Sequence, residues 1–336
     1  MPHNAFRSVV LGLLAASAMG AQANAGQVWT TFDPPGSVET TAIAVNAHGL
    51  IVGGYSDSNA VRHGFLRTVD ETITPFDEPD ADPNTDTAAL GVDTAGNLMG
   101  SFVKSGGTLG FVRKADGTFT SFRYKRLHTF PAAMNSRGVI VGFTFDDGGH
   151  VFLRKPNGVF MSLLSGMSAA PAAINKYNVV AGSVFAGSQV HGFVVSLTGG
   201  MTTFDPPGAT STQATSINAG GAITGTYTGS DNIGHGFLRE PDGTFVTFDA
   251  PNAGTTSGSF GTIPKSIDAD GNIAGCVYDN SSALHGFVRE SSGAMHTVDA
   301  PDATMSTCIA AIGPGGKLIG QTDSHGFKAL PRVWKQ

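Results

Sequence analysis

The feature that most constrains this chain is a repeat of 40 to 50 residues that runs along almost its whole length. A phenylalanine, usually in the segment "HGF", marks each copy, and a turn segment, Asn/Asp-x-x-Gly-x-(Ile/Leu/Val)-x-Gly, keeps step with it. The seven marker residues are Phe65, Phe111, Phe152, Phe193, Phe237, Phe287 and Phe327. Because every copy must fold in the same way, one repeat unit determines the architecture of the whole chain.

Each copy contains four short apolar runs, such as "ATSIN", "AITGTY", "HGFLRE" and "TFVTFD" in the fifth. Gly, Pro, Asn and Asp residues separate these runs, which predicts four antiparallel strands joined by tight turns. Tandem four-stranded units of this length are typical of β-propellers. The sequence therefore predicts an all-β chain in which residues 26–336 form a single seven-bladed β-propeller domain.

The repeat is out of phase with the ends of the chain. A segment of the outermost type, "WTTFD", lies at residues 29–33, whereas the seventh copy ends soon after its "HGF" and has no such segment of its own. We therefore expect residues 28–33 to complete the blade that begins near Ile309, closing the ring with strands from both ends of the chain.

The N-terminal 25 residues, "MPHNAFRSVVLGLLAASAMGAQANA", have the pattern of a secretory leader. Arg7 precedes an apolar run of about ten residues, and small residues flank a cleavage site after Ala25. We expect residues 1–25 to be a signal peptide and the protein to be secreted, either extracellular or periplasmic. The run is shorter than the roughly 20 residues of a membrane helix, so no membrane span is expected.

Charge and cysteine content narrow the range of partners. The net charge is −6, with no broad basic field or strip of basic and aromatic residues, which argues against nucleic acid as a partner. The two cysteines, Cys276 and Cys308, could form one disulfide in an oxidising compartment or remain unpaired.

The histidine of "HGF" recurs in six copies, and Leu109 replaces it in the second. Histidines distributed around a ring are too far apart to share a metal ion, so we expect each to pack against the next blade or to bond a turn carbonyl. The Asn or Asp that opens the turn segment is expected to bond its own backbone. "DADGN" from Asp268 is interpreted as such a turn rather than as a calcium loop. No metal or cofactor is expected.

Departures from the repeat are better candidates for a site than the repeated residues are. Five outer segments end in Asp before a proline turn, but after the second copy the pattern becomes "FRYKRLHTFP". This loop contains Arg123, Tyr124, Lys125, Arg126 and His128. The cations could hold a carboxylate or sulfate on a sugar that stacks on the tyrosine. Alternatively, His128 and Tyr124 could act as base and acid in a polysaccharide lyase, or the loop could be merely solvated or seal two irregular blades.

The segments "INAGGAITG" and "HGFLREPDGTF", together with the leader, resemble the HAF family of probable extracellular repeat proteins. The chain departs from that family in carrying "HGF" where the family motif has alanine. The resemblance implies a secreted repeat architecture and no established activity. We expect a non-catalytic protein that binds a glycan or a surface protein through its inter-blade loops. The alternative is a carbohydrate-active enzyme, a lyase or hydrolase of acidic polysaccharides, although familiar catalytic motifs are absent.

Overall fold

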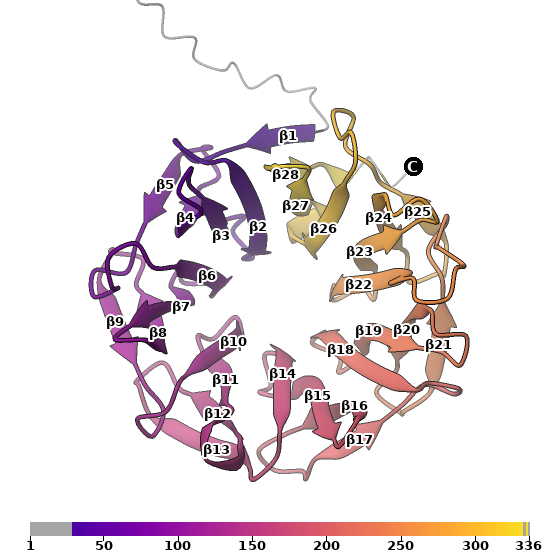
Figure 1. The fold of residues 1–336 in the computed structure, drawn as a ribbon, viewed down its shortest axis with the longest axis horizontal. Coiled ribbons are helices and arrows are strands. Elements are labelled where there is room, and N and C mark those ends of the chain that lie inside the picture. The colour runs from indigo at the N-terminus through magenta and orange to yellow at the C-terminus, as the bar shows by residue number, and fades with distance from the viewer. Residues whose placement is uncertain (1–28, 332–333, 335–336) are drawn as a thin grey trace, which may run out of the picture.

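The computed structural model describes residues 29–331 and 334, and these form seven four-stranded antiparallel sheets arranged as blades around a central opening (Figure 1). This confirms the predicted seven-bladed propeller. The expected signal peptide lies outside the described residues. Within the described residues, no helix has the length and hydropathy needed to cross a membrane.

The strands follow the chain from the innermost to the outermost position of each blade (Figure 1). Blade 1 contains β2 (Glu39–Val45), β3 (Ile51–Ser56), β4 (Arg62–Arg67) and β5 (Ile73–Phe76). Blade 2 contains β6 (Thr87–Val92), β7 (Leu98–Lys104), β8 (Gly107–Arg113) and β9 (Phe119–Phe122). Blade 3 contains β10 (Phe130–Met134), β11 (Ile140–Thr144), η1 (Asp146–Gly148), β12 (His150–Arg154) and β13 (Phe160–Ser165). Blade 4 contains β14 (Ala169–Ile174), β15 (Val180–Ala186), β16 (Gln189–Val195) and β17 (Thr202–Phe204). Blade 5 contains β18 (Ser211–Ile217), β19 (Ile223–Thr228), β20 (Gly234–Arg239) and β21 (Phe245–Phe248). Blade 6 contains β22 (Thr262–Ile267), β23 (Ile273–Tyr278), β24 (Leu284–Arg289) and β25 (Met295–Thr297). Blade 7 combines β26 (Thr307–Ile312), η2 (Pro314–Gly316), β27 (Leu318–Thr322) and β28 (His325–Ala329) with β1 (Trp29–Phe32).

The N-terminal strand closes the ring as the phase of the repeat predicts. In the antiparallel pair of β1 and β28, Trp29 lies opposite Ala329 and Phe32 lies opposite Gly326. The C-terminal Trp334 is buried against the same blade, and its Nε1 donates a hydrogen bond to the carbonyl oxygen of Gly316 at 3.0 Å. Both ends of the described chain are therefore held by blade 7.

Packing between strands explains the repeated glycines and phenylalanines. All seven marker phenylalanines are fully buried. The glycine before Phe65 makes room for the outer strand, because a Cβ on Gly64 would lie 2.6 Å from the ring of Phe76. The last glycine of the turn segment faces a bulged inner strand, where a Cβ on Gly53 would lie 2.0 Å from the carbonyl oxygen of Thr41. Neither position has room for a side chain.

The first residue of the turn segment builds the turn, as expected, and in four blades it also joins neighbours. Oδ1 of Asn46 accepts backbone hydrogen bonds from His48 and Leu50, while its Nδ2 donates to the carbonyl oxygen of Asp93 in the next blade at 2.9 Å. Three more asparagines make the same link to the following blade: Asn135, Asn175 and Asn218. Each of these side chains therefore provides hydrogen bonds to buried backbone groups and also joins two neighbouring blades.

The ring has two faces with different connections. The turns between the first and second strands and between the third and fourth strands of each blade lie on one side, which we call the turn face. The turns between the second and third strands and the crossings from one blade to the next lie on the other side, which we call the crossing face. A disulfide between Cys276 on β23 and Cys308 on β26, with Cα atoms 4.9 Å apart, joins blades 6 and 7.

Candidate functional site

The repeated histidines pair with the aspartates that end the outer strands. Nδ1 of His63 lies 2.9 Å from Oδ1 of Asp77 on the crossing face. Four other pairs repeat this geometry: His191 with Asp205, His235 with Asp249, His285 with Asp299 and His325 with Asp33. The expected partner was a turn carbonyl or the neighbouring blade, so the assignment is corrected to a side-chain carboxylate of the same blade. The sequence carries a partial signal for this pairing, because the second copy lacks both residues, but the third copy keeps His150 without an aspartate, and its Nδ1 lies 3.2 Å from Oγ of Ser165 instead.

Some of these histidines are held by a second carboxylate. Nε2 of His235 lies 3.2 Å from Asp231, and Nε2 of His285 lies 3.5 Å from Asp279. Burial by itself lowers the pKa of His235 and His285, but the hydrogen bonds and charges of their two carboxylates outweigh it, and the pKa of each histidine is raised. With both ring nitrogens engaged, these histidines order the loops of the crossing face and leave no free nitrogen for a substrate.

No metal site emerges from these pairs. Over residues 29–331, no group of three or more His, Cys, Asp or Glu side chains is arranged to hold a metal ion. Asp268 accepts backbone hydrogen bonds from Asp270 and Asn272, and its second oxygen accepts one from the Asn272 side chain. The "DADGN" segment thus has the geometry of a closed turn.

In the basic loop after blade 2, the tyrosine is buried whereas the charged residues are exposed. Tyr124 is only 4% exposed, and its ring stacks on Phe152 of blade 3 with centroids 4.7 Å apart. The ring therefore belongs to the contact between two blades and is not available to stack on a sugar or to act as an acid. The alternative in which this loop seals the two irregular blades describes Tyr124 correctly.

The charged residues of the same loop lie on the surface. Arg123 and His128 both approach the turn at Gly107, since a Cβ built there would lie 3.5 Å from Nη2 of Arg123 and 3.6 Å from Cε1 of His128. Lys125 and Arg126 take left-handed backbone conformations, with φ of 49° and 64°. None of these residues lines the clefts described below.

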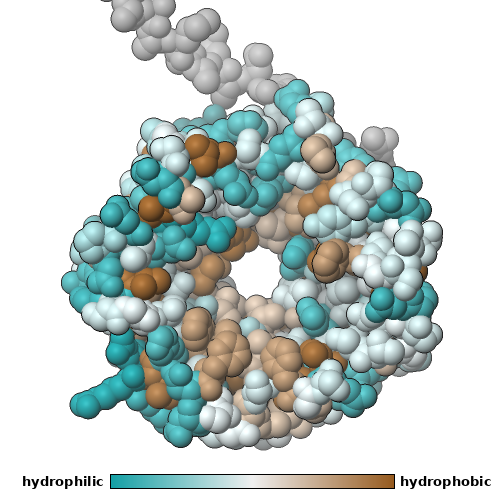
Figure 2. All heavy atoms as spheres, in the orientation of Figure 1, coloured by the Kyte–Doolittle hydropathy of each residue, from teal (hydrophilic) through white to brown (hydrophobic). Residues whose placement is uncertain are grey.

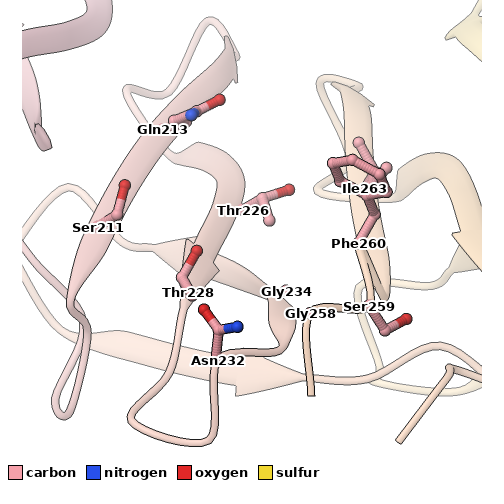
Figure 3. Close-up of a pocket in the computed structure, with 10 residues that line it drawn as sticks. All are labelled: Ser211, Gln213, Thr226, Thr228, Asn232, Gly234, Gly258, Ser259, Phe260 and Ile263. Carbon is pink, nitrogen blue, oxygen red and sulfur yellow. The ribbon is translucent and has the colours of Figure 1, made fainter. Parts of the chain in front are cut away.

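A polar cleft lies on the crossing face between blades 5 and 6 (Figure 3). We call it the Phe260 cleft; its volume is about 390 Å³. Serine, threonine, asparagine and glutamine side chains from β18, β19 and the following turn form one side, and Phe260 and Ile263 form the other (Figure 3). Its lining residues are Ser211, Gln213, Thr226, Thr228, Asn232, Gly234, Gly258, Ser259, Phe260 and Ile263. None of these side chains is ionisable.

The cleft exists because the crossing from β21 to β22, residues 249–261, is the longest of the seven. Backbone hydrogen bonds fasten it to the preceding turn: Gly234 donates to Ser259 at 3.0 Å, and Gly258 donates to Asn232 at 2.7 Å. Phe260 is held at this junction with 71% of its surface exposed. The exposed ring of Phe260, held by its own loop beside a polar cleft, is the candidate contact surface on this side of the ring.

A second cleft lies on the other side of Phe260. It has a volume of about 380 Å³ and is lined by residues 256–260 together with Tyr278, Asp279, Asn280 and Ser282. The rings of Phe260 and Tyr278 lie 5.6 Å apart. Phe260 therefore forms a ridge between two adjacent depressions that are both rich in hydroxyl and amide groups. No charged departure from the repeat marks this ridge in the sequence; the signal that could have found it is the length of the crossing, residues 249–261.

Another aromatic group lies on blade 3. Phe130, Phe143 and Phe145 contact one another, with the rings of Phe143 and Phe145 5.0 Å apart, and Phe145 is 57% exposed. Figure 2 shows apolar side chains gathered beside the central opening over β10 to β17, the region to which blade 3 belongs. This cluster provides an exposed aromatic ring for comparison with Phe260.

Comparison with known proteins defines the architecture and nothing finer. No family model matches the chain, and no curated protein matches it. Among solved structures it is similar to a streptogramin B lyase, at 14% identity and a TM-score of 0.60, over 89% of this chain and 96% of that one. It is also similar to a selenomethionine-substituted virginiamycin B lyase from Staphylococcus aureus, at 12% identity and 0.61, over 90% and 99%. The propeller domain of the Trilobed protease from Pyrococcus furiosus aligns at 7% identity and 0.57, over 87% and 95%. At such identities the likeness shows that the chain shares the propeller fold of these proteins.

Proposed function

We propose that this protein is a secreted, non-catalytic propeller that binds a glycan in the Phe260 cleft. The observation that carries the proposal is the exposed ring of Phe260 standing between two depressions lined by hydroxyl and amide groups. A sugar ring offers an apolar C–H face to an aromatic side chain and hydroxyl groups around its edge to such polar groups. The leader sequence and the resemblance to the HAF family support the secreted address.

The charge of the cleft favours a neutral glycan. Its lining has no cation to pair with a uronate or sulfate, and Asp279 borders the second depression. A buried or half-buried carboxylate without a cationic partner is unfavourable, so an acidic polysaccharide would bind poorly here. Gln213 and Asn232 each provide both a donor and an acceptor, which suits hydroxyl groups that play both roles.

The enzymatic alternative receives less support from the geometry. A lyase centred on residues 123–128 needs Tyr124 beside the substrate, and this ring is buried between blades. A glycoside hydrolase needs two carboxyl groups about 5 to 9.5 Å apart across the scissile bond. Asp279 is the single carboxylate among the residues that line the two depressions beside Phe260.

A glycan array probed with the purified full chain tests the proposal, followed by calorimetric titration of each glycan that binds. We expect neutral oligosaccharides to bind, and Phe260→Ala to weaken binding by about tenfold, as loss of an aromatic contact with its buried area predicts. Phe145→Ala removes another exposed aromatic ring and should leave binding unchanged. Equal affinity in the two variants would place the glycan elsewhere.

A parallel ultraviolet assay for unsaturated uronates, with acidic polysaccharides as substrates, tests the alternative function. Product formation that survives Phe260→Ala and is lost in Arg123→Ala and His128→Ala would overturn the non-catalytic proposal. No product together with binding of a neutral glycan would support it.

A further inference from the structure

A separate cavity lies on the turn face, where blade 7 meets blade 1. It has a volume of about 230 Å³, and we call it the seam cavity. Its apolar walls include Val45, Ile51, Val69 and Ile319. Its basic side chains are Arg67, Lys317 and Lys328, His48 also lines it, and no carboxylate does. The cavity thus combines an apolar wall with a concentration of positive charge.

The two lysines are departures from the repeat. Lys328 follows Phe327, and the residue at the same position in the other six copies is always leucine or valine: Leu66, Val112, Leu153, Val194, Leu238 and Val288. Lys317 stands where the other copies have Leu50, Asn97, Val139, Val179, Ala222 and Asn272. Blade packing is therefore satisfied six times without a cation at either position. Both exceptions occur in one blade and line one cavity.

The charges around the cavity are unbalanced. Arg67, which is 3% exposed, lies 3.1 Å from Glu71, and Nζ of Lys328 lies 3.2 Å from the same carboxylate. The side chain of Lys317 is exposed and has no hydrogen bond or ion pair with any residue that the structure describes. Three cations and one carboxylate give an excess of two positive charges, since +3 and −1 sum to +2. Such an excess of positive charge beside apolar side chains attracts an anion.

We propose that the seam cavity binds a small organic anion, a carboxylate carried on a short apolar body. The carboxylate would pair with Lys317 in the field of Arg67 and Lys328, and the apolar body would contact the valine and isoleucine side chains. The volume lies below the roughly 300 to 1,000 Å³ of sites for drug-sized ligands, so the anion is small. Because the walls come from the first and last blades, the bound anion would also stabilise ring closure by mass action.

Benzoate is the probe, and benzyl alcohol is its neutral counterpart. With the full chain, we expect saturable binding of benzoate by ligand-observed NMR and calorimetry, a rise in Tm, and weakening by added salt. Benzyl alcohol should bind at least about tenfold more weakly, because it lacks the charge that pairs with lysine. Absence of saturable benzoate binding, or binding of inorganic sulfate in its place, would overturn the proposal.

Variants locate the site. Lys317→Ala and Lys328→Leu introduce residues that the other blades carry at these positions, so both should fold, as circular dichroism can verify. Lys317→Ala should weaken benzoate binding by about tenfold, the effect of removing one charge-assisted contact, and Lys328→Leu should weaken it by a smaller factor, because Lys328 acts through its charge. Lys176→Ala removes an exposed lysine from the turn face of blade 4 and should have no effect. Equal benzoate affinity in all three variants would refute the assignment. Phe260→Ala leaves the seam cavity intact, so this test is independent of the proposed glycan site.

Discussion

Nδ1 of His325 lies 2.6 Å from Oδ2 of Asp33, so a contact between residues 292 positions apart reinforces the closure of the ring. The other four histidine–aspartate pairs join residues 14 positions apart, such as His63 and Asp77. The geometry is the same in both cases, but in blade 7 the pair joins the two ends of the chain. The same contact therefore stabilises a single blade in four cases and joins the two ends of the ring in the fifth.

Asp33→Ala should loosen β1 from blade 7. Because both side chains are partly exposed, we expect a loss of about 1 kcal/mol or less in the free energy of unfolding. The backbone amides of β1 should exchange with solvent faster, as hydrogen-exchange mass spectrometry can measure. Asp77→Ala breaks the equivalent pair inside blade 1 and should leave exchange in β1 unchanged. Similar exchange of β1 in both variants would show that the pair has no special part in closure.

The stability of the crossing face should depend on pH through His235 and His285. Their pKa values are raised above the ordinary 6.5, so their contribution is complete below pH 6.5 and is lost as pH rises through the higher folded-state pKa. Hydrogen bonds lower the pKa of Asp231 and of Asp279. The largest contribution comes from the backbone N–H of Ile233 for Asp231 and from the Ser281 side chain for Asp279. Their contribution is present above the ordinary 3.8 and is lost as pH falls through the lower folded-state pKa.

We therefore expect a plateau in Tm between about pH 4 and pH 6.5, with a decline on its alkaline side. Replacing both histidines by glutamine should remove that alkaline decline. His48→Gln changes an exposed histidine whose side chain has no hydrogen-bond or ion-pair partner among the described residues, and should leave the profile as it is. NMR titration of the imidazole Cε1 protons checks the direction of the two shifts, and values below 6.5 would contradict it.

Tyr124 should behave as a packing residue. Tyr124→Ala is expected to cost about 3 kcal/mol of stability, the usual loss when a buried aromatic side chain is truncated. Tyr124→Phe keeps the ring on Phe152 and should cost much less. Arg123→Ala and Arg126→Ala, at exposed positions, should stay within about 0.5 kcal/mol of the parent. Urea unfolding measures all four, and a neutral Tyr124→Ala would contradict the burial of this ring.

The disulfide between blades 6 and 7 should contribute measurably to stability. It joins residues 32 positions apart, and a loop of this size predicts a loss of about 2 to 4 kcal/mol when both Cys276 and Cys308 are changed to alanine. Reduction of the parent protein should shift its unfolding midpoint by a similar amount, and the double variant should not respond to the reductant. An unchanged midpoint in both experiments would show that the bond is energetically neutral.

Much of the fold could be predicted because its signals are local and are repeated seven times. The number of blades, the order of strands and the closure by residues 29–33 all follow from the spacing of short segments. The turn role of Asn46 follows from its place before glycine, but its hydrogen bond to Asp93 does not, because that contact depends on how two blades pack. The candidate site was placed wrongly for Tyr124, because a departure from the repeat can face the interior as readily as the solvent.

The architecture follows from the sequence alone, since each blade is specified by its own turns and apolar runs and the ring results from repeating them. The positions of the sites follow only from the folded molecule, because they depend on contacts between blades. Phe260 is exposed because its long crossing is fastened to the preceding turn, and no local pattern encodes that attachment. Lys317 and Lys328 meet Arg67, some 250 residues earlier in the chain, because closure of the ring places the last blade beside the first.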